Sequence, residues 1–141
     1  MEQLTADPHH LFVYGTLRSD VAGPTQAELM RGLRLVGRAS IAGRLHDAGW
    51  HPAAVESGDP ADRITGELWV MDADAAPRLL AALDEYEGID AARPDLSLFV
   101  RQAVTAERED GTRVSTWVYF FNGPVDSMPR IPSGDWLRRG A

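Results

Sequence analysis

The sequence HLFVYGTLR occupies residues 10–18. Residues 10–14 form a short apolar run that stops at Gly15, which is typical of a buried strand. Residues 15–23 are then expected to form a connecting loop. A strand that opens into Gly-Thr can present consecutive backbone N–H groups to an anion, since Gly15 lets a ligand approach the backbone and Thr16 adds a hydroxyl. By itself this pattern is weak, because any strand that exits into a loop can look like Tyr-Gly-Thr, and an ordinary turn is the more common explanation.

Outward from this stretch, the pattern predicts a chain made mostly of strands. Residues 1–9 are expected to form a loose tail, and a short helix is expected to begin near Pro24. The predicted strands cover residues 33–45, 53–56, 64–71, 99–107 and 113–121. The first of these is one bent strand or two short ones, because Gly37 and Gly43 mark bulges.

One amphipathic helix is expected in the middle of the chain. Asp74 is the predicted N-cap, Pro77 falls in the first turn, and the helix ends at about Tyr86. Its apolar face is formed by Leu79, Leu80, Leu83 and Tyr86.

The end of this helix carries three carboxylates, in the sequence LDEYEG of residues 83–88. Acidic side chains oppose the helix dipole at this end, so their presence requires a reason. Glu87 follows Leu83 by four residues and shares its apolar face, whereas Glu85 points away and Asp84 lies on the flank. A carboxylate facing the core has a raised pKa, which is the property of a general acid or base. The alternative is a frayed helix end with three solvated acids.

The composition indicates one globular domain covering residues 1–141, with 44% hydrophobic and 25% charged residues. The chain contains no cysteine, which excludes thiol nucleophiles, disulfides and cysteine zinc sites. All 14 basic residues are arginine, so Schiff-base and P-loop lysine chemistry are excluded as well.

The charge pattern limits the partners and the location. A net charge of −7 disfavours nucleic acid and anionic membranes. The chain has no apolar run long enough for a membrane span and no signal-peptide pattern, so a cytoplasmic protein is expected. His46, Asp47 and His51 have a spacing that fits no standard zinc motif, and no metal site is predicted.

Two motifs together resemble those of the γ-glutamylcyclotransferase-like family, which includes the γ-glutamylamine cyclotransferases and the plant AIG2-like proteins. These are YGTLR at residues 14–18 and LDEYEG at 83–88. A strand with Arg101 and a late WVY strand at residues 117–119 follow in the family's order. The resemblance spans residues 11–136. It implies an α+β fold, a small mixed β-barrel flanked by a few helices.

The resemblance also implies a reaction on a small-molecule substrate. The α-amine of an L-γ-glutamyl amine or amide attacks its own γ-carbonyl, releasing 5-oxoproline and an amine without metal or cofactor. Glu87 matches the family's catalytic glutamate, and the family's substrate loop falls on Tyr14, Gly15, Thr16 and Leu17.

Three further positions bear on the substrate. Many family members carry Tyr two residues before the strand arginine, where this chain has Phe99, and Tyr119 on the neighbouring strand is a candidate for the missing hydroxyl. Arg101 is expected to pair with Glu87 or with a substrate carboxylate, the alternative being a surface arginine.

Two other functions remain open from the sequence. The protein can be a binding module, in which the predicted substrate loop and Glu87 hold a small acidic ligand without turnover. It can also use Glu87 to activate water, in a hydrolase or an amidotransferase-like enzyme. The sequence determines neither the amine half of the substrate nor the oligomeric state.

Overall fold

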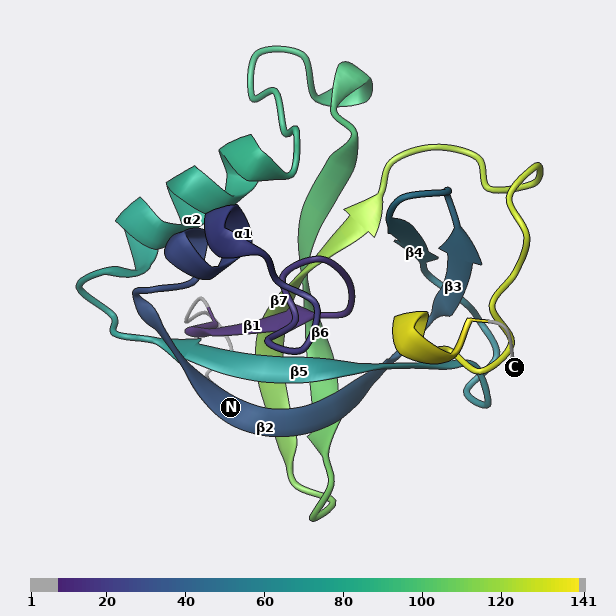
Figure 1. Ribbon diagram of the computed structural model, residues 1–141, viewed down its shortest axis with the longest axis horizontal. Helices are drawn as coiled ribbons and strands as arrows, with labels where there is room; N and C mark the ends of the chain where they lie inside the picture. Colours follow the sequence, from purple (N-terminus) through teal and green to yellow (C-terminus); the bar gives the residue numbers. More distant parts are fainter. Residues whose placement is uncertain (1–7, 140–141) are drawn as a thin grey trace.

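A closed five-stranded β-barrel forms the centre of the protein in a computed structural model, which describes residues 8–139 (Figure 1). Residues 1–7 of the predicted tail and residues 140–141 lie outside the described residues. Around the barrel the strands are β1 (His10–Val13), β5 (Arg63–Met71), β2 (Leu33–Ala42), β6 (Phe99–Arg108) and β7 (Arg113–Phe121). Neighbouring strands are antiparallel except β1 and β7, which pair in parallel where Leu11 meets Trp117. The barrel is therefore mixed, as predicted.

The remaining elements lie around the barrel. The two α-helices are α1 (Pro24–Leu29) and α2 (Ala76–Tyr86), and short 3₁₀ turns occur at Pro94–Leu96 and Trp136–Arg138. Strands β3 (Arg44–Asp47) and β4 (Pro52–Val55) form a separate antiparallel hairpin. In Figure 1 the helices lie together at one side of the barrel and the hairpin lies at the other. The α+β architecture predicted from the sequence is confirmed. Within residues 8–139, no helix is both long and apolar enough to cross a membrane.

Side chains of β1 alternate between two hydrophobic cores. Phe12, together with Tyr14 just after the strand, belongs to a core that includes residues of the other barrel strands. Leu11 and Val13 belong to a second core, which contains Leu83 of α2. Because both faces of β1 are covered, its sequence is a continuous apolar run rather than an alternating one.

The segment predicted as one bent strand or two short ones is two strands. Glycine is suited to a β-bulge, and the register between β2 and β5 shifts between Leu35 and Gly37, where Gly37 has a φ of 152°. Gly43 then separates β2 from β3. The chain leaves the barrel at this point, so the β3–β4 hairpin is free to extend to the mouth of the site described below.

The start of α2 differs from the prediction. The N-cap is Ala75 rather than Asp74, and no side chain caps the helix. The backbone N–H groups of Ala75 and Ala76 instead donate to the carbonyl oxygen of Asp72, each at 3.0 Å. A backbone turn before the helix thus takes the place of a capping side chain. Pro77 lies in the first turn, as predicted.

Candidate active site

Glu87 is the C-cap residue of α2 and is positioned by the backbone at the helix end. The N–H of Gly88 donates to the carbonyl of Glu85 at 3.1 Å, and the N–H of Ile89 donates to the carbonyl of Asp84 at 3.0 Å. This pair of bonds is the Schellman arrangement, which needs a left-handed residue just after the cap. Gly88 supplies it with a φ of 74°. Gly88 therefore fixes the backbone conformation at the end of α2, where the Glu87 side chain is attached.

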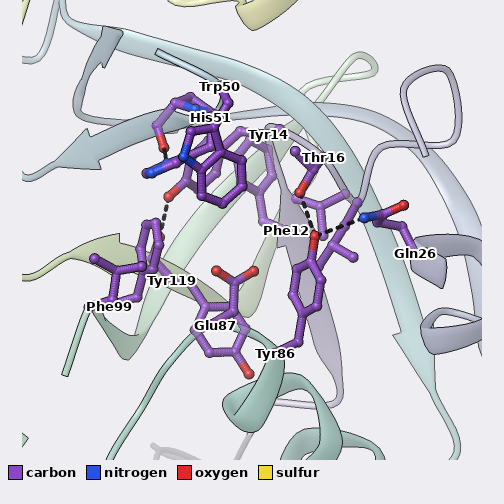
Figure 2. A pocket seen from close by; sticks show the side chains of 15 residues that line it. Phe12, Tyr14, Thr16, Gln26, Trp50, His51, Tyr86, Glu87, Phe99 and Tyr119 are labelled. Atoms are coloured by element: carbon purple, nitrogen blue, oxygen red, sulfur yellow. Dashed lines mark hydrogen bonds between the residues drawn. The ribbon is translucent and has the colours of Figure 1, made fainter. Parts of the chain in front are cut away.

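The Glu87 side chain lines a cavity of about 270 Å³. Figure 2 shows its carboxylate pointing into the space between the surrounding aromatic side chains. Burial raises the pKa of Glu87 from 4.5 to about 7, and the negative charge of Asp84 adds to the effect. Glu85 is exposed and does not line the cavity. The helix phase inferred from the sequence is thus confirmed.

The predicted substrate loop forms another part of the same cavity. Tyr14, Gly15, Thr16 and Leu17 all line it. Among the residues described, the backbone N–H groups of Gly15, Thr16 and Leu17 donate to no protein acceptor. Buried amides are rarely left unpaired, and Gly15 and Leu17 are buried. The loop therefore offers consecutive hydrogen-bond donors to a ligand.

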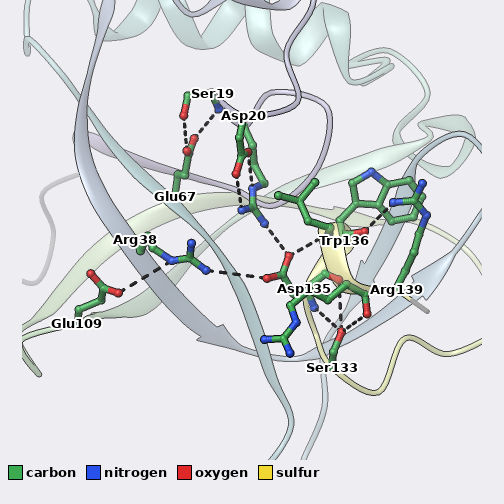
Figure 3. A network of polar contacts seen from close by, with 12 residues as sticks. Ser19, Asp20, Arg38, Glu67, Glu109, Ser133, Asp135, Trp136 and Arg139 are labelled. Carbon is green, nitrogen blue, oxygen red and sulfur yellow. Dashed lines mark hydrogen bonds and ion pairs between the residues drawn. The ribbon is translucent and has the colours of Figure 1, made fainter. Parts of the chain in front are cut away.

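A network of ion pairs and hydrogen bonds fixes the end of this loop (Figure 3). Arg18 is only 1% exposed, and its guanidinium contacts the carboxylates of Asp20 and Asp135, each at 2.9 Å. The next residue, Ser19, donates its backbone N–H to Glu67 at 2.7 Å. These bonds connect the loop to β5 and to the C-terminal segment, so its geometry is set before a ligand binds.

Hydrogen-bonding side chains form a polar wall beside the loop. The hydroxyl of Tyr86 lies 2.9 Å from the hydroxyl of Thr16 and accepts a hydrogen bond from Gln26 at 3.2 Å. Tyr86 was assigned from the sequence only to the apolar face of the helix. Its ring is half-buried while its hydroxyl reaches the loop, so one side chain links α2, α1 and the substrate loop.

Tyr119 lines the cavity, but its hydroxyl already has a partner. It donates to Asp84 at 2.6 Å, while its backbone carbonyl accepts from the hydroxyl of Tyr14. Burial raises the pKa of Tyr119, and the hydrogen bond to Asp84 adds to the increase. Burial also raises the pKa of Tyr14, with a further contribution from the charge of Glu87. Both hydroxyls therefore stay protonated and act as donors.

Arg101 is the one predicted site residue that does not line the cavity. Its guanidinium binds Asp84 instead, at 2.8 and 3.2 Å, and stacks on the Trp117 ring at 4.4 Å. The expected pairing with Glu87 is not formed. Arg101 and Tyr119 are directly opposite in the β6–β7 pair, and side chains of such pairs lie on the same face of a sheet. Both therefore reach the carboxylate of Asp84, beside Glu87.

An aromatic wall completes the cavity, and sequence reasoning did not predict it as a unit. Trp50 and His51 come from the turn between β3 and β4, and Phe99 begins β6. Ring centroids are 4.3 Å apart for Trp50 and His51, and 5.8 Å apart for His51 and Phe99. The only signal in the sequence was a tryptophan within a predicted turn, where large aromatic residues are uncommon.

Gly15 also packs closely against a neighbouring strand. It does not have a positive φ, and a Cβ at this position would lie 2.6 Å from Cγ of Pro52. Pro52 also lines the cavity. Glycine is therefore required for close packing of the substrate loop against β4.

The model of the family described as "Gamma-glutamyl cyclotransferase, AIG2-like" matches residues 11–138. The "Gamma-glutamylcyclotransferase family protein YtfP" of Escherichia coli (strain K12) is 31% identical over 130 residues, covering 92% of this chain and 96% of YtfP.

Solved structures show the same fold. YkqA from Bacillus subtilis superposes with a TM-score of 0.67 and 26% identity, over 92% of this chain and 39% of the longer YkqA chain. An AIG2-like protein from Mus musculus has a TM-score of 0.66 at 22% identity, covering 89% of this chain and 86% of the mouse protein. The similarity to the mouse protein bears on the fold alone.

Proposed function

Because the chain belongs to the γ-glutamyl cyclotransferase, AIG2-like family, we propose that it converts an L-γ-glutamyl amine or amide into 5-oxoproline and a free amine. The observation that carries this proposal is Glu87. Its carboxyl group has a pKa raised to about 7 and lies in a cavity shared with the unpaired amides of residues 15–17. A carboxylate with a pKa near neutrality both accepts and returns a proton efficiently.

Glu87 carries the protons in this reaction. The substrate's α-ammonium gives one proton to the Glu87 carboxylate, and the amine nitrogen then forms a bond to the γ-carbonyl carbon. Glu87 returns the proton to the leaving nitrogen as the carbon–nitrogen bond breaks. The new ring nitrogen loses its remaining extra proton through the same carboxylate to solvent or to the released amine. Every step is a proton transfer or an acyl transfer, so the reaction requires no cofactor.

The loop and the cavity walls supply orientation and charge stabilisation. The amides of Gly15, Thr16 and Leu17 are the donors for the anionic groups of the substrate, its α-carboxylate and the developing oxyanion. The attack is intramolecular, so holding the glutamyl chain in a curled conformation removes much of the entropic barrier. The hydroxyls of Tyr14 and Tyr119 stay protonated, so neither of them is the proton acceptor of this reaction.

Incubation with a panel of L-γ-glutamyl amines and amino acids tests the proposal, with 5-oxoproline and glutamate both quantified. Release of 5-oxoproline in equal amount to the free amine is expected for at least one compound. Release of glutamate in its place would indicate a hydrolase that activates water. Tight binding without any product would instead indicate a binding module for a small acidic ligand.

A further inference from the structure

The cavity has two chemically different walls. Thr16, Gln26 and Tyr86 form a hydrogen-bonded cluster beside the free amides of the loop. The other wall consists of Trp50, His51 and Phe99, which are in edge contact, and Leu98 adjoins Phe99 in the lining. In Figure 2, Glu87 lies between the polar and the aromatic groups. A substrate that places its reacting amide at Glu87 therefore extends one end to each wall.

The aromatic wall is open to solvent where the cavity begins. Trp50 is 75% exposed and Leu98 is 44% exposed, although both line the cavity. Two large apolar side chains exposed together at one cavity form a patch of the kind that ligand-binding sites present. An apolar ligand group placed there would bury both side chains.

The charge of the lining disfavours an anionic partner. Of the 15 residues that line the cavity in the described part of the chain, none is an arginine, and the chain contains no lysine. The Nδ1 of His51 lies 2.9 Å from the carbonyl oxygen of Pro52, which can only accept, so this nitrogen is the donor. A carboxylate at the aromatic wall would thus lack an arginine or lysine partner, and the loop amides are already required by the glutamyl half.

We propose that Trp50, His51, Leu98 and Phe99 form the subsite for the amine half of the substrate, and that this subsite selects an uncharged aromatic or bulky apolar amine. This inference rests on the proposed function for the glutamyl half. It places the amine against Trp50 and Phe99. The leaving amine then departs through the solvent-exposed mouth of the cavity.

Three substrates with the same glutamyl half test the inference. These are γ-L-glutamyl-phenethylamide, γ-L-glutamyl-ethylamide and γ-L-glutamyl-glutamate. We expect kcat/KM for 5-oxoproline release to be highest for the phenethylamide. In Trp50→Ala, kcat/KM should fall about tenfold for the phenethylamide and by much less for the ethylamide. A tenfold loss is typical when an aromatic contact and its buried apolar area are removed. Leu35→Ala is the matched control, because Leu35 is also apolar and 45% exposed but does not line the cavity.

Two outcomes overturn the subsite. One is a γ-glutamyl-glutamate that reacts faster than the phenethylamide. The other is an equal loss for the phenethylamide and the ethylamide in Trp50→Ala, which would assign Trp50 a general role in the loop. Thermal unfolding of each variant accompanies the kinetics, and Trp50→Ala is expected to unfold like the wild type because Trp50 is so exposed.

Binding separates failure of the subsite from failure of the proposed function. Calorimetric titration of the same compounds into Glu87→Gln measures affinity without turnover. Tighter binding of the phenethylamide, lost in the double variant with Trp50→Ala, supports the subsite even if no compound yields 5-oxoproline. Equal affinity for the phenethylamide and the ethylamide overturns it, whichever reaction the protein catalyses.

Discussion

Replacing Glu87 by glutamine, with Glu85→Gln as its matched control, separates the proposed catalytic carboxylate from its neighbour. Glutamine keeps the size of the side chain but cannot accept the proton, and losing a general base typically costs about 10²–10⁴ in rate. Glu85 is exposed and points away from the cavity. Its substitution is therefore expected to leave kcat/KM for 5-oxoproline release unchanged.

The same substitution should stabilise the protein, by an amount that depends on pH. The pKa of Glu87 rises from 4.5 to about 7 on folding. Each pKa unit corresponds to ~1.4 kcal/mol, so an ionised Glu87 destabilises the folded protein by at most about 3 kcal/mol. The cavity is open to solvent, which reduces this value. The penalty is absent below pH 4.5, where both states are protonated, grows as the pH rises, and is complete above pH 7.

Thermal unfolding at a series of pH values measures this effect. At pH 8 the melting temperature of Glu87→Gln is expected to exceed that of the wild type by about 3–8 °C, given roughly 4 °C for each kcal/mol at this chain length. At pH 4 the two proteins should melt at nearly the same temperature. Full activity in Glu87→Gln would refute its catalytic role, and a stability difference that does not vary with pH would refute the raised pKa. Loss of activity in Glu85→Gln alone would mean that the helix phase is wrong.

Three further substitutions test the surroundings of Glu87. Asp84→Asn removes a negative charge that raises the pKa of Glu87, so the acidic limb of the kcat/KM profile should move to lower pH, and a move to higher pH would contradict this. Phe99→Tyr restores the hydroxyl common in the family and should raise turnover or broaden the substrate range, whereas unchanged kinetics across the substrate panel would leave the position with a packing role. Gly15→Ala places a Cβ against Pro52, so denaturant titration should show a loss of about 1–3 kcal/mol and calorimetry weaker binding, and wild-type values in both would contradict the close packing.

The sequence by itself determined the parts of this protein that depend on local spacing. The apolar run at residues 10–14 predicted β1, which is buried on both faces. Helical periodicity placed Glu87 on the face of Leu83 and Glu85 on the opposite face, and the structure confirms both positions. Such inferences succeed because the period of a helix or strand relates residues only a few positions apart, and their relative directions follow from backbone geometry alone.

Helix capping was less predictable even at short range. Asp74 has the side chain of a good N-cap, yet the backbone carbonyl of Asp72 accepts the free N–H groups at the start of α2. A side-chain cap and a backbone turn satisfy the same donors at similar free energy. The choice between them depends on how the chain arrives from β5, and composition does not record that path.

Only the tertiary structure decided which partners surround Glu87. Asp84 appeared as a flanking acid, but it accepts hydrogen bonds from Arg101 and from Tyr119, which lies 35 residues away along the chain. Trp50 and His51 reach the cavity because the chain leaves the barrel after β2 and turns between β3 and β4. Contacts of this kind depend on the register of the strands and on the closure of the barrel, which bring distant residues together. A local pattern specifies the direction of a side chain, whereas its neighbour across a cavity is specified only when the whole chain has folded.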